Sequence, residues 1–218
     1  MNARSIRTFA ILPAAGRSVR IGHPKLLLPL ADGRSLVEHV LGAWRASQTS
    51  AIVVVVRGDD VALAERCRGE RTTVVQPEVD PSDMKASIAA GLEYVRAEYA
   101  PRADDAWLVA PADMPLLPAT AIDAVIAVYH ECCRGVVPVG AAIPRPSLVV
   151  PYCRGRRGHP VLFPWSLAAE VAKLATDEGL NRLLERHPTL AVDIADEGIL
   201  NDVDTAEDYA RLRRGSGI

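Results

Sequence analysis

Short apolar runs alternate with segments of helical spacing along this sequence, and no other feature constrains the fold as strongly. In the first half of the chain the runs are Arg7–Pro13, Ala51–Val56, Thr72–Val75 and Ala106–Ala110. Each run is short, rich in apolar or β-branched residues and closed by turn-forming residues, which indicates a strand. Runs that are apolar throughout are typical of strands covered on both faces, as in a parallel sheet.

The segments between these runs begin with residues that favour helix N-termini. Ser35 and Glu38, for example, have the spacing of a capping box. Helices are therefore expected at 35–46, 60–67, 83–98 and 118–133. Because strand–helix–strand repetition gives parallel strands with crossovers, the sequence predicts an α/β fold. We expect a Rossmann-like, mostly parallel (mixed) sheet with helices on both faces.

After Gly135 the alternation changes, and strands follow one another with Pro-, Gly- and Arg-rich turns between them. Strands are expected at Val136–Val139, Ser147–Tyr152, Val161–Phe163 and Leu190–Ile194. Helices are expected at Pro164–Leu174, at Asp177–His187 and from Thr205 onward. No linker, internal repeat or low-complexity tract divides the chain, so residues 1–218 are expected to form a single domain.

Composition and charge disfavour several classes of function. The formal net charge is −2, whereas proteins that wrap nucleic acid are normally basic. No apolar run approaches the ~20 residues that cross a bilayer, and the segment Met1–Arg7 does not resemble a signal peptide. The four cysteines show no C-x-x-C spacing that would indicate zinc. We therefore expect a cytoplasmic protein with reduced thiols and with no nucleic acid or membrane partner.

The loop from Pro13 to Lys25 directly follows the first strand, where ligands bind in parallel sheets. Its small residues let backbone N–H groups approach a ligand closely, and they are Ala14, Ala15 and Gly16. Its basic residues are Arg17, Arg20 and Lys25. Backbone donors together with positive charge are suited to a triphosphate.

Two other phosphate-binding motifs do not fit this loop. The dinucleotide fingerprint requires glycine where the chain has Ser18. The Walker pattern requires Gly-Lys-Ser/Thr, whereas Gly22 is followed by His23, Pro24 and Lys25. The first mismatch argues against a nicotinamide-dependent oxidoreductase.

The stretch Ala14–Leu30 closely resembles the signature of the molybdenum-cofactor nucleotidyltransferase-like family, most strongly its cytidylyltransferase branch. Further family motifs follow in order at Asp83–Leu92, Ala110–Pro115, Arg157–Phe163 and Asp202–Asp208. The resemblance implies a GT-A-like nucleotidyltransferase domain. It also implies Mg²⁺-dependent transfer of a nucleoside monophosphate from an NTP to a phosphate on an acceptor, with release of pyrophosphate.

The resemblance implies roles for individual residues as well. The nucleotide would be bound by Ala14, Ala15, Gly16, Arg17, Ser18 and Ser87, while Lys25 and Arg20 would stabilise the leaving pyrophosphate. Mg²⁺ would be held by Asp113 and Asp202, with Asp204 as the alternative second ligand. The acceptor would lie against Gly158, His159 and Pro160.

His159 is expected to bind the acceptor or to shape its loop rather than to transfer a proton. A phosphate monoester has its second pKa near ~6, so the attacking oxygen is already anionic at neutral pH. Catalysis then consists of aligning that oxygen with the α-phosphorus and neutralising the crowded negative charge.

The identities of the nucleotide and of the acceptor rest on finer features. In the families that this chain resembles, Ala-Ala-Gly accompanies cytidine nucleotides, so CTP is favoured over GTP. Molybdopterin is the first expectation for the acceptor. The proline before Ala-Ala-Gly, Pro13, is a feature that this chain shares with the methylerythritol-phosphate cytidylyltransferases. In the acceptor-side region, Gly179–Asn181 departs from the Gly-Ala-Arg that the resemblance leads us to expect. Sugar-phosphate or methylerythritol-phosphate acceptors therefore stay open, as does a non-catalytic nucleotide-binding protein.

Overall fold

The computed structural model describes residues 5–17, 24–135 and 147–215. Eight strands form one sheet: β1 (Thr8–Pro13), β2 (Ala51–Val55), β3 (Thr72–Val75), β4 (Ala106–Val109), β5 (Leu148–Cys153), β6 (Arg156–Arg157), β7 (Val161–Pro164) and β8 (Thr189–Asp193). The α-helices are α1 (Leu36–Ala46), α2 (Val61–Cys67), α3 (Met84–Tyr99), α4 (Ala119–Arg134), α5 (Ala168–Val171), α6 (Asn181–Arg186) and α7 (Ala206–Gly215). Short 3-10 helices are η1 (Lys25–Leu27), η2 (Trp165–Leu167) and η3 (Glu197–Leu200). The expected strand at Val136–Val139 lies outside the described residues.

The sheet is mostly parallel, with one antiparallel strand, β7, near its middle and another, β6, at the end of the strand order. The strand order is β3-β2-β1-β4-β7-β5-β6, and β8 also pairs with β5. Strands β1 to β4 are parallel to one another, whereas β7 lies antiparallel between β4 and β5. Val161, at the start of β7, pairs with Val109, at the end of β4. The loop that enters β7 therefore lies at the same edge of the sheet as the carboxyl ends of β1, β2 and β4.

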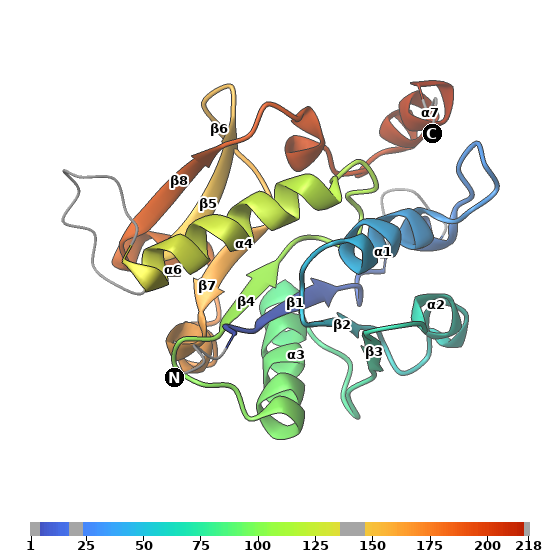
Figure 1. Ribbon diagram of the computed structural model, residues 1–218. Helices are drawn as coiled ribbons and strands as arrows, with labels where there is room; N and C mark the ends of the chain where they lie inside the picture. The colour runs from blue at the N-terminus through green and yellow to red at the C-terminus, as the bar shows by residue number, and fades with distance from the viewer. Residues whose placement is uncertain (1–4, 18–23, 136–146, 216–218) are drawn as a thin grey trace.

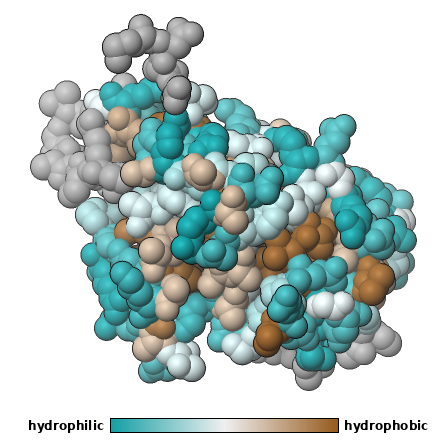
Figure 2. All heavy atoms as spheres, turned by 90° about the horizontal axis from the view of Figure 1, so that it is seen from below, coloured by the Kyte–Doolittle hydropathy of each residue, from teal (hydrophilic) through white to brown (hydrophobic). Residues whose placement is uncertain are grey.

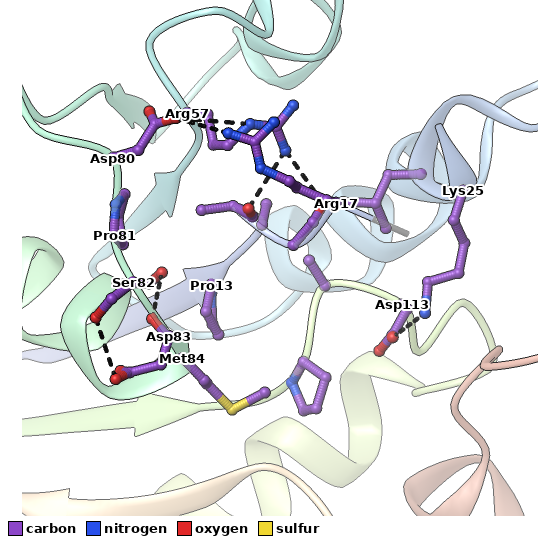
Figure 3. Close-up of a pocket in the computed structure, with 17 residues that line it drawn as sticks. Pro13, Arg17, Lys25, Arg57, Asp80, Pro81, Ser82, Asp83, Met84 and Asp113 are labelled. Carbon is purple, nitrogen blue, oxygen red and sulfur yellow. Dashed lines mark hydrogen bonds and ion pairs between the residues drawn. The ribbon is translucent and has the colours of Figure 1, made fainter. Parts of the chain in front are cut away.

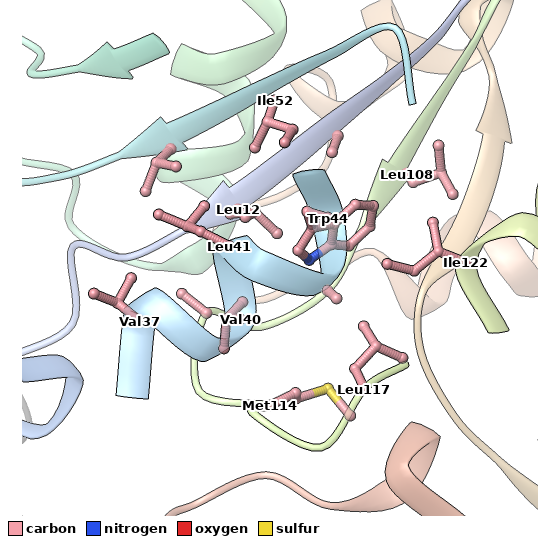
Figure 4. Packing of buried hydrophobic residues seen from close by; sticks show 14 of the residues in the cluster. Leu12, Val37, Val40, Leu41, Trp44, Ile52, Leu108, Met114, Leu117 and Ile122 are labelled. Atoms are coloured by element: carbon pink, nitrogen blue, oxygen red, sulfur yellow. The ribbon is translucent and has the colours of Figure 1, made fainter. Parts of the chain in front are cut away.

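The central strands β1, β2 and β4 are apolar on both faces, and helices cover both faces of the sheet (Figure 1). In β1, Ala10 and Leu12 face the core beneath α1 and α4, while Phe9 and Ile11 face the core beneath α3. Trp44 of α1 is fully buried in the first of these cores (Figure 4). The continuous apolar runs of the sequence are thus confirmed as strands with two buried faces, as expected for a parallel sheet.

Side-chain caps fix where several helices begin. Glu38 accepts a hydrogen bond from the Ser35 N–H at 2.8 Å, which confirms the capping box before α1. The Asp83 carboxylate accepts from Ala86 N–H at 2.8 Å and starts α3. The second of these caps matters for function, because α3 begins at the edge where the strands of the parallel half end.

Two helices of the second half are shorter than the sequence predicts. The expected helix at Pro164–Leu174 is wrong in its first part, because Pro164 pairs with Ala106 as the last residue of β7. A 3-10 turn and a single α-helical turn follow, ending at Val171. The helix expected at Asp177–His187 begins only at Asn181, after Gly179. Glycine in a helix interior is unfavourable, which accounts for the late start.

An arginine-rich segment that we expected to be a turn is a short hairpin. Tyr152 pairs with Arg157, and Cys153 pairs with Arg156. Arg154 and Gly155 connect the strands with φ values of 50° and 73°. Positive φ at both central residues matches the twist of a two-residue hairpin. The hairpin places Arg157 one residue before the loop 158–160.

No helix within the described ranges is long and apolar enough to span a bilayer. The face of the molecule seen in Figure 2 is mostly hydrophilic, with apolar side chains in separate small groups. Among the large apolar residues that are exposed, Val79 and Met84 belong to the segment that leads into α3 and to its first residue. Exposed single apolar residues of this kind are normal on a protein surface.

Candidate functional site

A pocket of about 340 Å³ lies at the carboxyl edge of the parallel strands (Figure 3). It brings together seven of the residues predicted to act on the nucleotide or the metal: Ala14, Ala15, Gly16, Arg17, Lys25, Ser87 and Asp113. Ser18 and Arg20, which were predicted to join them, lie outside the described residues. Loops separated by up to 100 residues thus meet in one place, as the parallel topology requires. We call this cavity the loop pocket.

Lys25 and Asp113 form a short ion pair on one side of the loop pocket. The Lys25 Nζ lies 2.6 Å from Asp113 Oδ2 and 3.3 Å from Asp204 Oδ1. Only 12% of the Lys25 side chain is exposed. A partly buried ammonium group beside two carboxylates is held much more firmly than a surface ion pair. The 3-10 helix η1 therefore begins at a positive charge that is held in place, because Lys25 is its first residue.

Asp113 is partly buried, and one of its carboxylate oxygens has no partner among the described residues. Its Oδ1 is buried and makes no hydrogen bond with any described residue. Burial raises the pKa of the Asp113 carboxyl, an effect opposed by Lys25 and reinforced by the charges of Asp202 and Asp204. A buried oxygen that lacks a donor costs free energy unless another group satisfies it. This oxygen is therefore available for a cation or another ligand.

The segment from Asp202 to Asp204 is attached to the Asp113 turn by its backbone. The Val203 N–H donates to the Asp113 carbonyl at 3.0 Å. The following helix starts with a side-chain cap, because Thr205 Oγ1 donates to Asp208 Oδ2 at 2.7 Å. Asp204 points to Lys25, and Asp202 is exposed to solvent. Both acidic residues are close enough to raise the pKa of Asp113.

These carboxylates have the chemistry of a Mg²⁺ site rather than of a closed metal cage. Within the described part of the chain, no group of three His, Cys, Asp or Glu side chains converges. Mg²⁺ is usually held by one or two carboxylates and by substrate phosphates, with water completing its shell. The unpartnered Asp113 oxygen and the nearby Asp202 match that donor set.

Arg57 and Asp80 line the loop pocket and were missed by the sequence analysis. Arg57 donates from Nη1 to the carbonyl oxygens of Ala15 and Gly16, both at 3.4 Å. Asp80 lies 3.4 Å from Arg17 Nη2 and accepts a hydrogen bond from the Gly58 N–H at 3.2 Å. Position offered a signal: Arg57 follows strand β2 and Asp80 follows β3, where a parallel sheet binds ligands.

Ser87 and Lys85 both lie in the first turn of α3, but their side chains make different contacts. The buried Ser87 donates through Oγ to the Asp83 carbonyl at 3.2 Å while lining the loop pocket. The Lys85 Nζ donates to the Ala175 carbonyl and, at 3.3 Å, to the Thr176 carbonyl. Lys85 therefore connects α3 to the segment before α6.

A second pocket, of about 420 Å³, lies beside the first and shares Met84 and Pro111 with it. Its walls are largely apolar, and the apolar side chains are Met84, Ile88, Val109, Pro111, Val161, Phe163, Leu180 and Leu184. Arg157, His159, Lys85 and Asn181 are its polar side chains. We call this cavity the apolar pocket. Arg157 donates to Asn181 Oδ1 at 2.9 Å, which joins the hairpin to α6.

The predicted acceptor loop lies at the apolar pocket. Gly158 and His159 line the cavity, and Pro160 is buried directly after them. The His159 N–H donates to the Ile199 carbonyl at 2.9 Å. A Cβ atom on Gly158 would lie 2.6 Å from that same carbonyl oxygen, so only glycine fits. The loop is thus clamped against η3.

The His159 ring is mostly buried. Burial lowers its pKa below the usual 6.5, an effect opposed by the Val109 backbone and by the charge of Asp202. Its Nδ1 is buried and has no hydrogen-bond partner among the described residues. The imidazole is therefore neutral at pH 7 and has one nitrogen available to a ligand.

Comparison with known proteins places this geometry in a family. The model of the MobA-like NTP transferase domain matches residues 10–191. The chain belongs to this family. It is accordingly a nucleotidyltransferase-family enzyme with the nucleotidyltransferase fold.

Individual relatives of this MobA-like chain differ in their described activities. It is 32% identical over 202 residues to the 2-C-methyl-D-erythritol 4-phosphate cytidylyltransferase of Streptomyces coelicolor, covering 88% of this chain and 72% of that protein. It is 30% identical to the nicotine blue oxidoreductase of Paenarthrobacter nicotinovorans, covering 93% of this chain and 94% of that protein.

Solved structures show the same fold. Rv0371c of Mycobacterium tuberculosis is 28% identical, with a TM-score of 0.70 over 97% of this chain and 100% of that one. A second structure of that protein, a complex with manganese, has a TM-score of 0.67 at 27% identity over 96% of this chain and 99% of that one.

Proposed function

We propose that this MobA-like enzyme transfers a cytidylyl group from CTP to the terminal phosphate of molybdopterin or its molybdenum cofactor and releases pyrophosphate. One observation carries the proposal: a buried, unpartnered Asp113 oxygen lies in the loop pocket, and an apolar pocket adjoins it across Met84 and Pro111. Nucleotidyl transfer requires such a pair of adjoining sites, because the two substrates must meet at one phosphorus atom. In this proposal residues 1–218 act as one domain.

The loop pocket would bind the NTP. Gly16, Arg17 and Ser18 would hold the triphosphate, with Ala14, Ala15 and Ser87 against the nucleoside. Lys25 and Arg20 would neutralise the leaving pyrophosphate. Charge neutralisation of this kind is the main catalytic contribution in phosphoryl chemistry, since the protein forms no covalent bond.

Asp113 and Asp202 would hold Mg²⁺, and Asp204 would anchor Lys25. When bound, the ion would supply charge neutralisation for the leaving pyrophosphate. The manganese complex of Rv0371c supports a divalent cation in this family. The geometry adds that Lys25 now lies against Asp113 and Asp204, so ammonium and metal compete for the same carboxylates.

The preference for CTP rests on the cytidylyltransferase relatives. Two of them, from Streptomyces species, are 31–32% identical to this chain. Their acceptor is a polyol phosphate, and it is the second candidate for this chain. A polyol exposes several hydroxyl groups, each of which needs a hydrogen-bonding partner when buried. The apolar pocket has eight apolar side chains and four polar ones, so it favours a flat, largely apolar acceptor such as a pterin.

The similarity to a nicotine blue oxidoreductase gives an oxidoreductase as a third candidate. The loop after β1 lacks the dinucleotide fingerprint, which disfavours this candidate. A nucleotide-binding protein without catalysis is the remaining alternative.

A first experiment is thermal unfolding of the purified protein with CTP, GTP, UTP, ATP and NADH, each with and without Mg²⁺. A ligand at 100 times its dissociation constant adds ~2.7 kcal/mol and shifts the midpoint measurably. We expect the largest Mg²⁺-dependent shift with CTP. A shift with NADH alone would favour an oxidoreductase, and the absence of any nucleotide-dependent shift would contradict the proposal.

A second experiment separates the acceptors. Pyrophosphate release from CTP is measured with molybdopterin and, separately, with methylerythritol phosphate. Release with molybdopterin alone supports the proposal, whereas release with the polyol phosphate alone assigns the second candidate. Binding of CTP without release in either reaction would indicate the non-catalytic alternative.

A further inference from the structure

Arg57 lines the loop pocket, follows strand β2, and contacts the backbone of the loop that follows strand β1. Its side chain is only 14% exposed. Nη1 donates to the carbonyls of Ala15 and Gly16, and the backbone carbonyl of Arg57 accepts a hydrogen bond from Gln76 Nε2 at 2.9 Å. The loops after β1, β2 and β3 are thus connected at this residue, as the dashed lines of Figure 3 show in part.

The positive charge of Arg57 is already neutralised. Asp59 lies 2.9 Å from Nε, Asp60 lies 3.8 Å from Nη2, and Asp80 lies 3.9 Å from Nε. Asp80 also pairs with Arg17 at 3.4 Å. Two guanidinium groups therefore face three carboxylates in this corner of the pocket. Among the described residues this corner carries no excess positive charge, so a contribution of Arg57 to triphosphate binding would have to come from something other than its charge.

Peptide geometry shows what that contribution is. In a planar trans peptide the C=O of one residue and the N–H of the next point in opposite directions. Because Arg57 binds the carbonyls of Ala15 and Gly16, the N–H groups of Gly16 and Arg17 point away from Arg57. Neither N–H donates a hydrogen bond to any other described residue, and both residues line the pocket.

We propose that Arg57 is a positioning residue for nucleotidyl transfer: it fixes the peptide planes at Ala15 and Gly16 so that two consecutive N–H groups are presented to the triphosphate. Asp59, Asp60 and Asp80 fix the guanidinium in turn. Consecutive backbone N–H groups form an anion-binding concavity only when their peptides share one orientation. The inference rests on the proposed use of an NTP in this pocket.

The test compares Arg57→Gln and Arg57→Lys with the wild type, with tripolyphosphate and CTP as probes, by isothermal titration calorimetry. If the two N–H donors lose their orientation, the affinity for each probe should fall about tenfold. Arg57→Lys should be as weak as Arg57→Gln, because a single ammonium cannot bind two carbonyls and the carboxylates together. This fold loss of affinity should be the same at about 50 and about 500 mM salt, because it does not arise from a contact between the guanidinium charge and a phosphate.

Two controls separate positioning from general damage. Arg66→Gln makes the same change on α2, where Arg66 pairs with Glu38 at 3.4 Å outside the pocket, and it should leave both affinities unchanged. Binding of Mn²⁺ without nucleotide should also stay unchanged in the Arg57 variants, because Asp113 is not touched by Arg57.

The outcomes that overturn the inference are distinct from those that overturn the proposed function. Full affinity in Arg57→Lys, or a loss that shrinks as salt rises, would show a direct charge contact and end the positioning role. Equal binding by wild type and Arg57→Gln would end it as well. Failure of the wild type to bind tripolyphosphate and CTP at all would instead contradict the proposed function.

Discussion

The two pockets on either side of Met84 and Pro111 are built by different means. The loop pocket is formed by loops at the carboxyl ends of parallel strands, and it is held by backbone hydrogen bonds and charged side chains. The apolar pocket is formed around an antiparallel strand and a short helix, and its walls are mostly carbon. Charged side chains and backbone N–H groups suit the triphosphate, which all NTPs share. The shape of an apolar wall, in contrast, distinguishes one organic acceptor from another. Under the proposed function, the first pocket would therefore carry out the chemistry and the second would select the acceptor.

The largest difference in effect between the two pockets is expected from Asp113→Asn, which changes the loop pocket alone. Removing the charge that is expected to hold the metal should lower turnover about 10³-fold, because several kcal/mol of charge stabilisation are lost. Pyrophosphate release measures this effect. Binding of the acceptor alone should not change, and the melting temperature should stay within a few degrees. Near-normal turnover would remove Asp113 from the chemistry.

Gly158→Ala is expected to have the opposite pattern of effects, because it changes the apolar pocket and leaves the loop pocket intact. The added Cβ would meet the Ile199 carbonyl at 2.6 Å, so the loop 158–160 must move away from η3. A displacement of about 1 Å lowers turnover with the acceptor about 10²-fold, while the CTP dissociation constant should stay constant. Gly42→Ala, on α1 where a Cβ meets no atom within 4 Å, is the matched control. A loss of CTP affinity would show that the pockets are not independent.

A third variant tests whether the ammonium of Lys25 occupies the position of a cation in the loop pocket. Lys25→Met leaves Asp113 and Asp204 without the charge that now lies 2.6 and 3.3 Å away. The affinity for Mn²⁺ without nucleotide should rise about tenfold, since one favourable competitor of the metal is removed. Electron paramagnetic resonance of free Mn²⁺ measures it. Lys85→Met, at the apolar pocket, should leave this affinity unchanged; an equal rise there would point to a general charge effect.

The smallest expected effect concerns the neutral imidazole of the apolar pocket. Burial lowers the pKa of His159 in the folded state below 6.5, so the unfolded chain binds the proton more readily. The contribution to stability is therefore complete above pH 6.5 and decreases as the pH falls below it. Urea unfolding at pH 7.5, 6.5 and 5.5 should show the decline, and His159→Gln should flatten it. His130, whose pKa burial also lowers, should retain its own share in that variant.

The sequence predicted the parallel half better than the antiparallel half. Strands such as Ala51–Val55 are read correctly because their burial on both faces leaves an apolar run, and α1 is read correctly because Ser35 and Glu38 are local neighbours. The end of β7 at Pro164 was missed because its pairing with Ala106 depends on residues far away in the chain. Local patterns contain no information about such pairing.

The candidate site was predicted unevenly for the same reason. Small residues and a lysine in the loop before Leu26 are a local pattern, and they line the loop pocket as expected. Arg57 was missed because its contacts are with two carbonyl oxygens of a loop more than 40 residues away in the chain, and no local pattern indicates them. The apolar wall formed by Phe163 and Leu184 was missed because such residues look like ordinary core positions until the fold brings them together.

The antiparallel insertion of β7 between β4 and β5 has a consequence for synthesis on the ribosome. Strands β1 to β4 emerge first and need only one another and their helices to associate. The outer side of β4, however, obtains its partner only when residues 161–164 have been made. Until then β4 is a fully apolar strand with unpaired backbone groups on its open side, the kind of edge that recruits foreign strands. The nascent chain is thus most vulnerable to aggregation between the completion of β4 and the arrival of β7.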